Sequence, residues 1–371
     1  MSSKINLLIC FFILHLLAAT NVRGRKIGIY EIKKGDFSVR ITNYGARIIS
    51  VLLPDKHEIS VTVSCSVPGN IGDVALGYDT VKEYENDTTS FGALLGRVAN
   101  RIGGAQFTLN GTLYKLIAND GANTLHGGPK GFSRVVWNVN KYEQDGPYPH
   151  ITLTYHSTDG EEGFPGDVLA SVTYALEDPY KLSVVMKAKA LNKATPVNLA
   201  QHTYWNIGGH NSGDILSNVV QIFASHITPV DEHLIPTGEI SPVKNTPYDF
   251  LKPREVGNQI SKLPSGYDIN YALDSTVEMK PVAIVYDKKS GRVMDLQASA
   301  PGVQFYTANS LIQKGKGGYV YQPHAALCFE TQGFPDAVNH PNFPSTIVTP
   351  GKAYVHKMLY TFSIMKYWNS Y

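Results

Sequence analysis

The sequence predicts an all-β protein, a large sandwich of antiparallel sheets. From Lys26 onward, short segments alternate between apolar and polar residues, as half-buried strands do. Gly, Pro, Asn and Asp separate these segments, and the 22 Tyr, 14 Phe and 33 Gly residues suit strands joined by many turns. Helical periodicity is scarce. Alternating strands without intervening helices pack as stacked antiparallel sheets.

The expected elements follow in chain order. A strand at 38–42 runs into a turn at 43–45, and a helix of one or two turns fits 81–85. Further strands are predicted at 151–155, 169–176, 181–190, 282–286, 293–298 and 358–364. The loop 287–291 joins two of these strands as a hairpin. Residues 58–70 fit no predicted element.

The first 24 residues are predicted to be a secretory signal peptide. Lys4 precedes an apolar run over 5–19 that is short for a membrane span, and small or polar residues follow it. Cleavage is expected between Ala19 and Gly24, and an uncleaved anchor is the alternative. No later apolar stretch is long enough to span a bilayer, so we expect a soluble, secreted protein.

Residues 25–371 are predicted to form a single domain. No linker-like stretch and no repeat of fixed period divides them, and large β-sandwiches can exceed the usual domain size. The near-balance of 33 basic and 31 acidic residues argues against a nucleic-acid partner.

Cysteine usage and two glycosylation sequons bear on the compartment. Cys10 lies in the predicted signal, and Cys65 and Cys328 are expected to be buried thiols rather than a disulfide scaffold. Asn86 and Asn110 each begin an Asn-x-Thr sequon, which could carry a glycan if the chain is secreted.

Familiar cofactor and metal motifs are missing. The sequence contains no phosphate-binding glycine loop of the nucleotide-binding kinds, no His-Glu-x-x-His and no paired cysteine ligands. The segment 314–318, Lys-Gly-Lys-Gly-Gly, is expected to be a flexible surface loop because no helix pattern follows it. We therefore expect no cofactor and no metal, and acid–base chemistry by ordinary side chains.

Two segments interrupt apolar strands with polar residues. If 198–206 is one strand, His202 shares a face with Asn198, Tyr204 and Asn206. In the second segment, 325–332, Glu330 follows mostly apolar residues, where a charge is costly unless it is paired, hydrogen-bonded or useful. The pattern alone leaves both a structural and a catalytic role open for His202 and Glu330.

Seven blocks in order along the chain resemble those of the aldose 1-epimerase (galactose mutarotase) family. They lie at 96–102, 123–128, 159–166, 198–206, 266–268, 301–306 and 328–332. The resemblance covers nearly the whole mature length and implies the family's galactose mutarotase-like supersandwich. One departure is Ile269, where the family usually has a His, which bears on hydroxyl preference at that end of the site.

The resemblance also implies the roles of the site residues. Glu330 would be the catalytic base and His202 the catalytic acid, reaching opposite edges of one pyranose. Asp268 would grip a hydroxyl and favour the charged form of His202, because a nearby carboxylate stabilises an imidazolium. The residues expected to bind sugar hydroxyls are Asn100, Arg101, His126, Asp268 and Gln304. Trp205 and Phe305 are expected to be packing residues.

The implied activity is interconversion of the α and β anomers of free aldoses such as glucose and galactose by a monomer. A secreted carbohydrate-binding sandwich without catalysis is the alternative, although it would not need both His202 and Glu330. A glycosidase needs two carboxylic acids flanking one bond, and only Asp268 could join Glu330. A sugar-phosphate epimerase would need an Arg or Lys cluster placed for phosphate, which the sequence does not offer.

Overall fold

The computed structural model describes residues 26–56, 69–178 and 180–365. The predicted signal peptide, Cys65 and most of 58–70 lie outside this range. The predicted all-β architecture is confirmed, and every strand ladder in the described range is antiparallel. No helix among the described residues has the length and apolar character needed to cross a bilayer.

The largest sheet in the described range has nine strands. In spatial order they are β10 (Asn138–Glu143), β11 (His150–Ser157), β12 (Val168–Leu176), β13 (Lys181–Ala190), β28 (Ala353–Ile364), β22 (Arg292–Ala298), β21 (Lys280–Tyr286), β16 (Val219–Ile222) and β19 (Arg254–Glu255). Consecutive hairpins build one half, and the long strand β28 joins it to the other half. The strands predicted at 151–155, 169–176, 181–190, 282–286, 293–298 and 358–364 all lie within this sheet.

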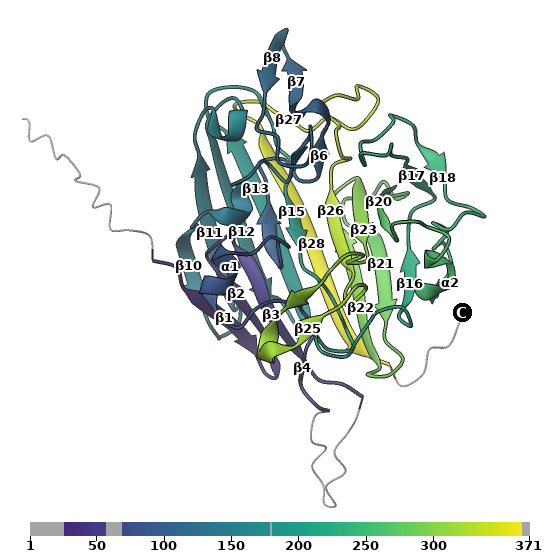
Figure 1. Cartoon of the computed structure of the whole chain (residues 1–371). Coiled ribbons are helices and arrows are strands. Elements are labelled where there is room, and N and C mark those ends of the chain that lie inside the picture. The colour runs from purple at the N-terminus through teal and green to yellow at the C-terminus, as the bar shows by residue number, and fades with distance from the viewer. Residues whose placement is uncertain (1–25, 57–68, 179, 366–371) are drawn as a thin grey trace, which may run out of the picture.

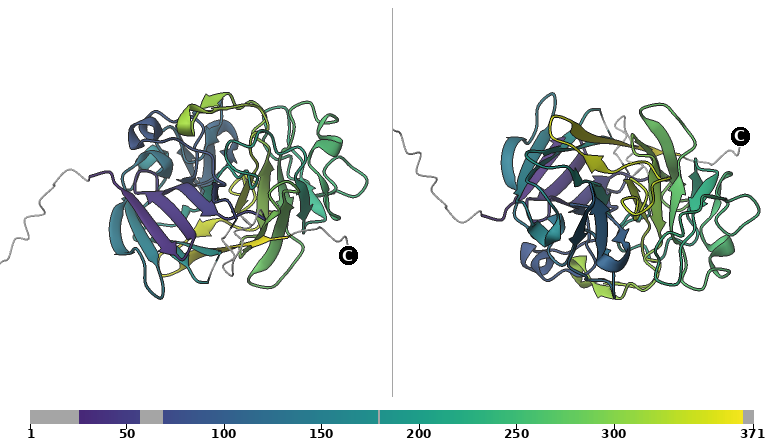
Figure 2. Two further views of the ribbon diagram at one scale, coloured as in Figure 1. Left: turned by 90° about the horizontal axis from the view of Figure 1, so that it is seen from below. Right: turned by 90° about the horizontal axis from the view of Figure 1, so that it is seen from above.

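Two smaller sheets accompany it. The first comprises β1 (Ile29–Lys34), β2 (Phe37–Thr42), β3 (Arg47–Leu53) and β4 (Gly72–Asp73). The second comprises β18 (Ser241–Pro242), β17 (His226–Thr228), β20 (Asp268–Ala272), β23 (Gly302–Tyr306) and β26 (Cys328–Gln332). Figures 1 and 2 show the purple N-terminal strands and the green strands on opposite sides of the molecule, with the yellow strand β28 between them.

Short two-stranded ladders complete the strand content. They pair β15 (Ala200–His202) with β5 (Ala93–Leu95), β6 (Arg101–Ile102) with β9 (Thr124–Leu125), β7 (Gln106–Leu109) with β8 (Thr112–Lys115), β14 (Thr195–Pro196) with β27 (Ile347–Val348), and β24 (Gln313–Lys314) with β25 (Val320–Tyr321). The helix predicted at 81–85 is α1 (Val81–Glu85), which begins with a capping box formed by Thr80 and Glu83. A second short helix is α2 (Gly257–Ile260).

One continuous apolar core joins the nine-stranded sheet to the two smaller sheets. Val39 of β2, Met186 of β13 and Phe305 of β23 belong to the same buried cluster. From Val184 to the end of β13 the burial alternates from residue to residue, because one face of the large sheet carries this core and the other meets solvent. Trp205 and Phe305 lie in the cluster as packing residues, as predicted.

The strand considered for 198–206 forms only in part, and the surface loop expected at 314–318 is wrong. The segment 198–206 forms a ladder only over Ala200–His202, because isolated bridges at Asn198 and Trp205 replace continuous pairing. The loop 314–318 is not wholly at the surface, because Lys316 is buried and its Nζ lies 2.7 Å from Asp73 Oδ2. The half-buried Asp73 carboxylate compensates for the cost of burying the ammonium group. Cys328 is a buried free thiol, as expected.

Candidate active site

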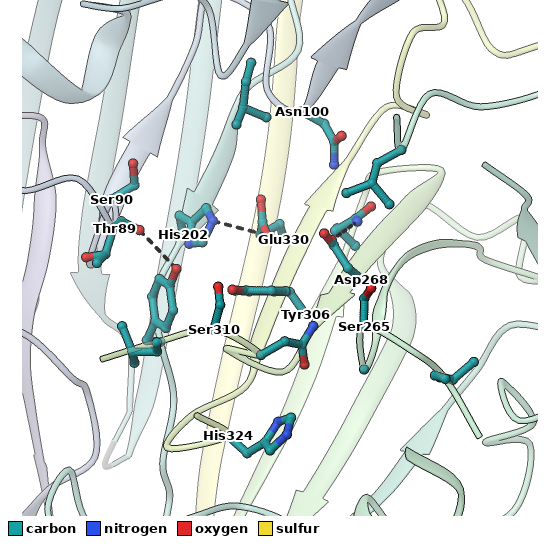
Figure 3. Close-up of a pocket in the computed structure, with 18 of the residues that line it drawn as sticks. Thr89, Ser90, Asn100, His202, Ser265, Asp268, Tyr306, Ser310, His324 and Glu330 are labelled. Atoms are coloured by element: carbon teal, nitrogen blue, oxygen red, sulfur yellow. Dashed lines mark hydrogen bonds and ion pairs between the residues drawn. The ribbon is translucent and has the colours of Figure 1, made fainter. Parts of the chain in front are cut away.

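A cavity of about 1160 Å³ opens among β6, β9, β15, β20, β23 and β26. Its lining includes all seven residues that the sequence singled out, namely Asn100, Arg101, His126, His202, Asp268, Gln304 and Glu330. Figure 3 shows how four of them, Asn100, His202, Asp268 and Glu330, face the same space. Residues separated by more than 200 positions therefore form one polar site.

His202 and Glu330 are in direct contact at the floor of this cavity. His202 ends β15, and Glu330 lies in the middle of β26, opposite Gln304 of β23. The distance from His202 Nε2 to Glu330 Oε1 is 3.4 Å, and both side chains are buried. They lie side by side rather than at opposite edges of a sugar ring, which corrects the expected arrangement. Two adjacent groups could act on the anomeric hydroxyl and the ring oxygen of one sugar, because both of these oxygens are bonded to the same carbon.

The backbone around Asn100 fixes the tautomer of His126. Both residues have positive φ, 61° and 54°, a conformation that Asn adopts more readily than most residues. The Asn100 amide donates to His126 Nδ1 at 3.1 Å, and the His126 amide donates back to the Asn100 carbonyl at 3.0 Å. Because Nδ1 accepts a hydrogen bond, the neutral ring carries its proton on Nε2. His126 packs edge-on against His202 and offers that N–H as a donor.

Asp268 and Gln304 form a pair on neighbouring strands. Gln304 Nε2 donates to Asp268 Oδ1 at 2.7 Å, and the two residues come from β20 and β23, which are hydrogen-bonded to each other. Within the described residues, Gln304 Oε1 and Glu330 Oε2 are buried without a hydrogen-bond partner. Buried polar atoms are rarely left unpaired, so these oxygens indicate where a polar ligand would bind.

Arg101 combines a structural and a site role. Its Nε forms an ion pair with Asp120 Oδ2 at 2.7 Å. That pairing uses one of five N–H donors, and Arg101 still lines the cavity.

Burial controls the charge of the His202–Glu330 pair. It lowers the pKa of His202 to about 4 and raises the pKa of Glu330 well above its ordinary value. Asp268 raises the pKa of Glu330 further through repulsion between the carboxylates, whereas Arg101 lowers it. The expectation that Asp268 would favour a charged His202 is therefore wrong, because burial outweighs the attraction to a carboxylate, which comes from Asp87, and favours a neutral pair.

Three groups in the cavity have the composition of a metal-binding set. One ligand atom each of His126, His202 and Glu330 lies within 4.8 Å of the other two. The tautomer of His126 opposes metal binding, because Nδ1 is occupied by the Asn100 amide and Nε2 carries the proton. A metal would require the loss of that backbone hydrogen bond or of the Nε2 proton.

Some wall residues were not among the predicted site residues. Tyr204 stacks on His202 with ring centroids 5.0 Å apart, and its hydroxyl donates to the Thr89 carbonyl at 3.0 Å. Tyr306 and His324 also line the cavity. The predicted alternation placed Tyr204 on the same face as His202, so this residue could have been found. His324 lies in a loop, where no periodicity signals its direction.

The other polar residues of the 198–206 segment act structurally. Asn198 exchanges hydrogen bonds with the backbone of Gly333, and Asn206 Nδ2 donates to the Ala325 carbonyl at 2.9 Å. Ile269, the departure from the family pattern, belongs to the apolar core. Its neighbour Asp268 lines the cavity because adjacent residues of β20 point to opposite sides.

Comparison with known proteins identifies the family. The family model described as aldose 1-epimerase matches residues 28–361. The galactose mutarotase of Sus scrofa is 40% identical over 338 residues, which cover 90% of this chain and 94% of the relative. The human galactose mutarotase is 38% identical over 92% of this chain and 95% of its own length. The aldose 1-epimerase of Escherichia coli K12 is 30% identical over 87% and 91%.

Solved structures share the architecture. The GalM/aldose epimerase homologue from C. elegans superposes with a TM-score of 0.84 at 27% identity, covering 92% of this chain and all of its own. The galactose 1-epimerase from Lactobacillus acidophilus has the same fold, with a TM-score of 0.76 at 22% identity over 92% and 99%. On the family match and these relatives, the chain belongs to the aldose 1-epimerase family.

Proposed function

We propose that this chain is an aldose 1-epimerase that interconverts the α and β anomers of free hexoses. The observation that carries the proposal is the contact between His202 Nε2 and Glu330 Oε1 at the floor of a cavity lined by hydrogen-bonding side chains. The relatives named galactose mutarotase support galactose as a substrate, and we propose glucose as a second one.

The catalytic pair would work with a single shared proton. Burial favours the neutral form with the proton on Glu330, and transfer across the 3.4 Å contact gives an imidazolium beside a carboxylate. Glu330 then takes the proton of the anomeric hydroxyl while His202 protonates the ring oxygen, and the bond between that oxygen and the anomeric carbon breaks. The aldehyde rotates and recloses on its other face, with both proton transfers reversed.

The remaining cavity residues would hold the sugar. His126 Nε2–H, Arg101 and the Asp268–Gln304 pair offer donors and acceptors around the ring. Asn100 would contribute mainly by fixing His126. Donors aimed at the ring oxygen would also stabilise the charge that develops there during ring opening.

The test is the rate at which optical rotation changes after α-D-glucose or α-D-galactose is dissolved. Wild-type protein should accelerate mutarotation, and Glu330→Gln and His202→Asn should each lose about 10²–10⁴-fold of that acceleration. Both variants should keep the wild-type circular dichroism spectrum. A wild-type protein that binds sugar but leaves the spontaneous rate unchanged would instead be a carbohydrate-binding module, and release of sugar from an aryl glycoside would indicate a glycosidase.

The cellular setting is proposed from sequence features. A signal peptide over residues 1–24 would deliver a single mature domain to the exterior, where sequons at Asn86 and Asn110 would carry glycans. We propose that the mature protein acts as a monomer, because one chain supplies every residue of the cavity.

A further inference from the structure

The two segments that carry the catalytic pair are not joined by a continuous ladder. The segment with His202 and the segment with Glu330 run antiparallel, and a backbone bridge joins them where Trp205 meets Leu327. From there to Gly333, no backbone hydrogen bond between the two segments occurs among the described residues. Since His202 and Glu330 lie in this stretch, something other than a sheet ladder must set their separation.

The far end of the stretch is closed by one side chain. Asn198 Oδ1 accepts from the Gly333 amide at 2.8 Å, and Asn198 Nδ2 donates to the Gly333 carbonyl at 3.2 Å. The amide side chain thus replaces the pair of hydrogen bonds that a ladder would make. Asn198 is 1% exposed, so these bonds are shielded from water.

His356 of β28 adds a second link from behind, between Leu199, which follows Asn198, and Thr331, which follows Glu330. Nδ1 of its imidazole lies 3.1 Å from the Leu199 carbonyl, and Nε2 lies 2.9 Å from Thr331 Oγ1. A carbonyl only accepts, so Nδ1 donates, and Nε2 then accepts from the Thr331 hydroxyl. Burial lowers the pKa of His356 to about 4, which keeps this neutral tautomer in place.

These links reach the catalytic residues through the backbone, directly next to Glu330 and three residues before His202. Thr331 directly follows Glu330 and points to the opposite face of β26, and Leu199 precedes the strand that ends in His202. Figure 1 shows β15, β26 and β28 running alongside one another. A cavity of about 340 Å³, separate from the active-site cavity, is lined by Asn198, Gly333 and His356. Close packing is therefore incomplete behind the two segments, and the polar links carry more of the restraint.

We propose that Asn198 and His356 form a clamp that sets the distance between His202 and Glu330, and that both are positioning residues for the reaction. The proposal rests on the proposed function, since it assigns them an effect on the chemical step. Neither side chain lines the active-site cavity, so the clamp should affect kcat and leave sugar binding nearly unchanged.

The decisive variants change the links with little change in shape. Thr331→Val removes the hydroxyl that His356 binds, and Asn198→Ala removes the Gly333 contacts. We expect a loss in kcat of about tenfold for Thr331→Val and about 10²-fold for Asn198→Ala, because small misplacements of catalytic groups are costly. KM should stay within about twofold. The double variant Thr331→Val/His356→Phe should be little worse than His356→Phe alone, since both remove one link.

Asn43→Ala is the matched control. Asn43 is also a buried asparagine that ties backbone segments together, bonding Gly28 and Trp137, but it does not line the cavity. It should lower the melting temperature comparably to Asn198→Ala while kcat stays at the wild-type value. Unchanged kcat in Thr331→Val and Asn198→Ala, a loss confined to KM, or an equal kcat loss in Asn43→Ala would each overturn the clamp. An inactive wild-type protein would remove the proposed function, and the clamp with it.

Discussion

The contact between His202 and Glu330 makes the two residues one titrating unit. Burial makes each group prefer its neutral form. At 3.4 Å, a charge on one group would stabilise the opposite charge on the other, so the two cannot titrate independently. In the proposed mechanism, the pair is active when it holds one exchangeable proton, on either His202 or Glu330. Its apparent pKa values therefore belong to the pair rather than to either residue.

This coupling predicts an unusual dependence of kcat/KM on pH. A second proton would have to bind at His202, whose pKa is lowered to about 4, so activity should be lost only as the pH falls through that region. The remaining proton leaves the pair only above the raised pKa of Glu330, so activity should persist as the pH rises toward neutrality. Polarimetry corrected for spontaneous mutarotation measures this profile, and circular dichroism at each pH checks the fold. An acid limb near 6.5, the ordinary imidazole value, would contradict the prediction.

The tautomer of His126 bears on whether the activity depends on a metal. Because the Asn100 amide occupies Nδ1 and the proton occupies Nε2, the set of His126, His202 and Glu330 should not need a metal. Prolonged treatment with a chelator should leave kcat and KM unchanged, and added zinc should not stimulate the enzyme. Activity that disappears with the chelator and returns with a divalent cation would sink this interpretation.

At the scale of elements, a buried ion pair shapes one wall of the cavity. Arg47 of β3 lies 2.6 Å from Asp87, and both side chains are fully buried. The same carboxylate accepts from the amides of Thr89 and Phe91, which folds the loop after α1. Residues 88–90 of that loop line the cavity, so the ion pair connects core stability with the shape of the site.

Removing the cation should therefore destabilise the fold. Arg47→Met would leave the Asp87 carboxylate buried without its partner, and we expect the free energy of unfolding to fall by about 3–5 kcal/mol. Urea denaturation measures the loss. Lys288→Met is the control, because its ion pair with Glu255 is largely exposed and should contribute about 0–1 kcal/mol. Equal losses in the two variants would show that burial of the Arg47 pair does not matter.

The elements also show what can be predicted from sequence. Strands such as β12 and β13 are long enough for alternation to be visible, and both lie where the sequence placed them. Ladders of two residues, such as β14 and β24, have no periodicity to detect. The 198–206 segment alternates like a strand, yet side-chain bonds from Asn198 replace part of its ladder. Whether such a segment forms a continuous ladder depends on hydrogen-bond partners that are distant in sequence.

At the scale of the whole molecule, topology creates the site. Asn100 and Glu330 meet because β26 joins β23 and β20 in one sheet while the β6–β9 ladder lies across the cavity from it. Strand alternation alone could identify His202 and Glu330 as polar residues whose burial is costly. Only the resemblance to the family indicated that they lie together with Arg101 and His126. The charge state of the pair depends on burial, which required the three-dimensional structure.

Two sequons on the outer surface bear on whether the protein is exported. Asn110 and Gly111 have φ values of 52° and 78° at the exposed tip of the β7–β8 hairpin, a two-residue turn with positive φ that suits Asn-Gly. Figure 1 shows this hairpin projecting from the body of the molecule, and Asn86 is also exposed, at the end of α1. Both sequons are therefore open to glycan attachment in the secretory pathway.

Expression in a eukaryotic secretory host should yield a protein in the medium, with an N-terminus between residues 20 and 25. Enzymatic deglycosylation should lower its mass by two glycans. Thr112→Ala should remove one glycan, and it keeps Asn110, which tolerates positive φ better than a replacement such as Gln would. Since the hairpin tip lies outside the cavity lining, kcat and KM should not change in this variant. Intact-mass spectrometry of the wild type and the variant measures both features. An unmodified chain retained in the cell with residues 1–24 in place would contradict both the signal peptide and the use of the sequons.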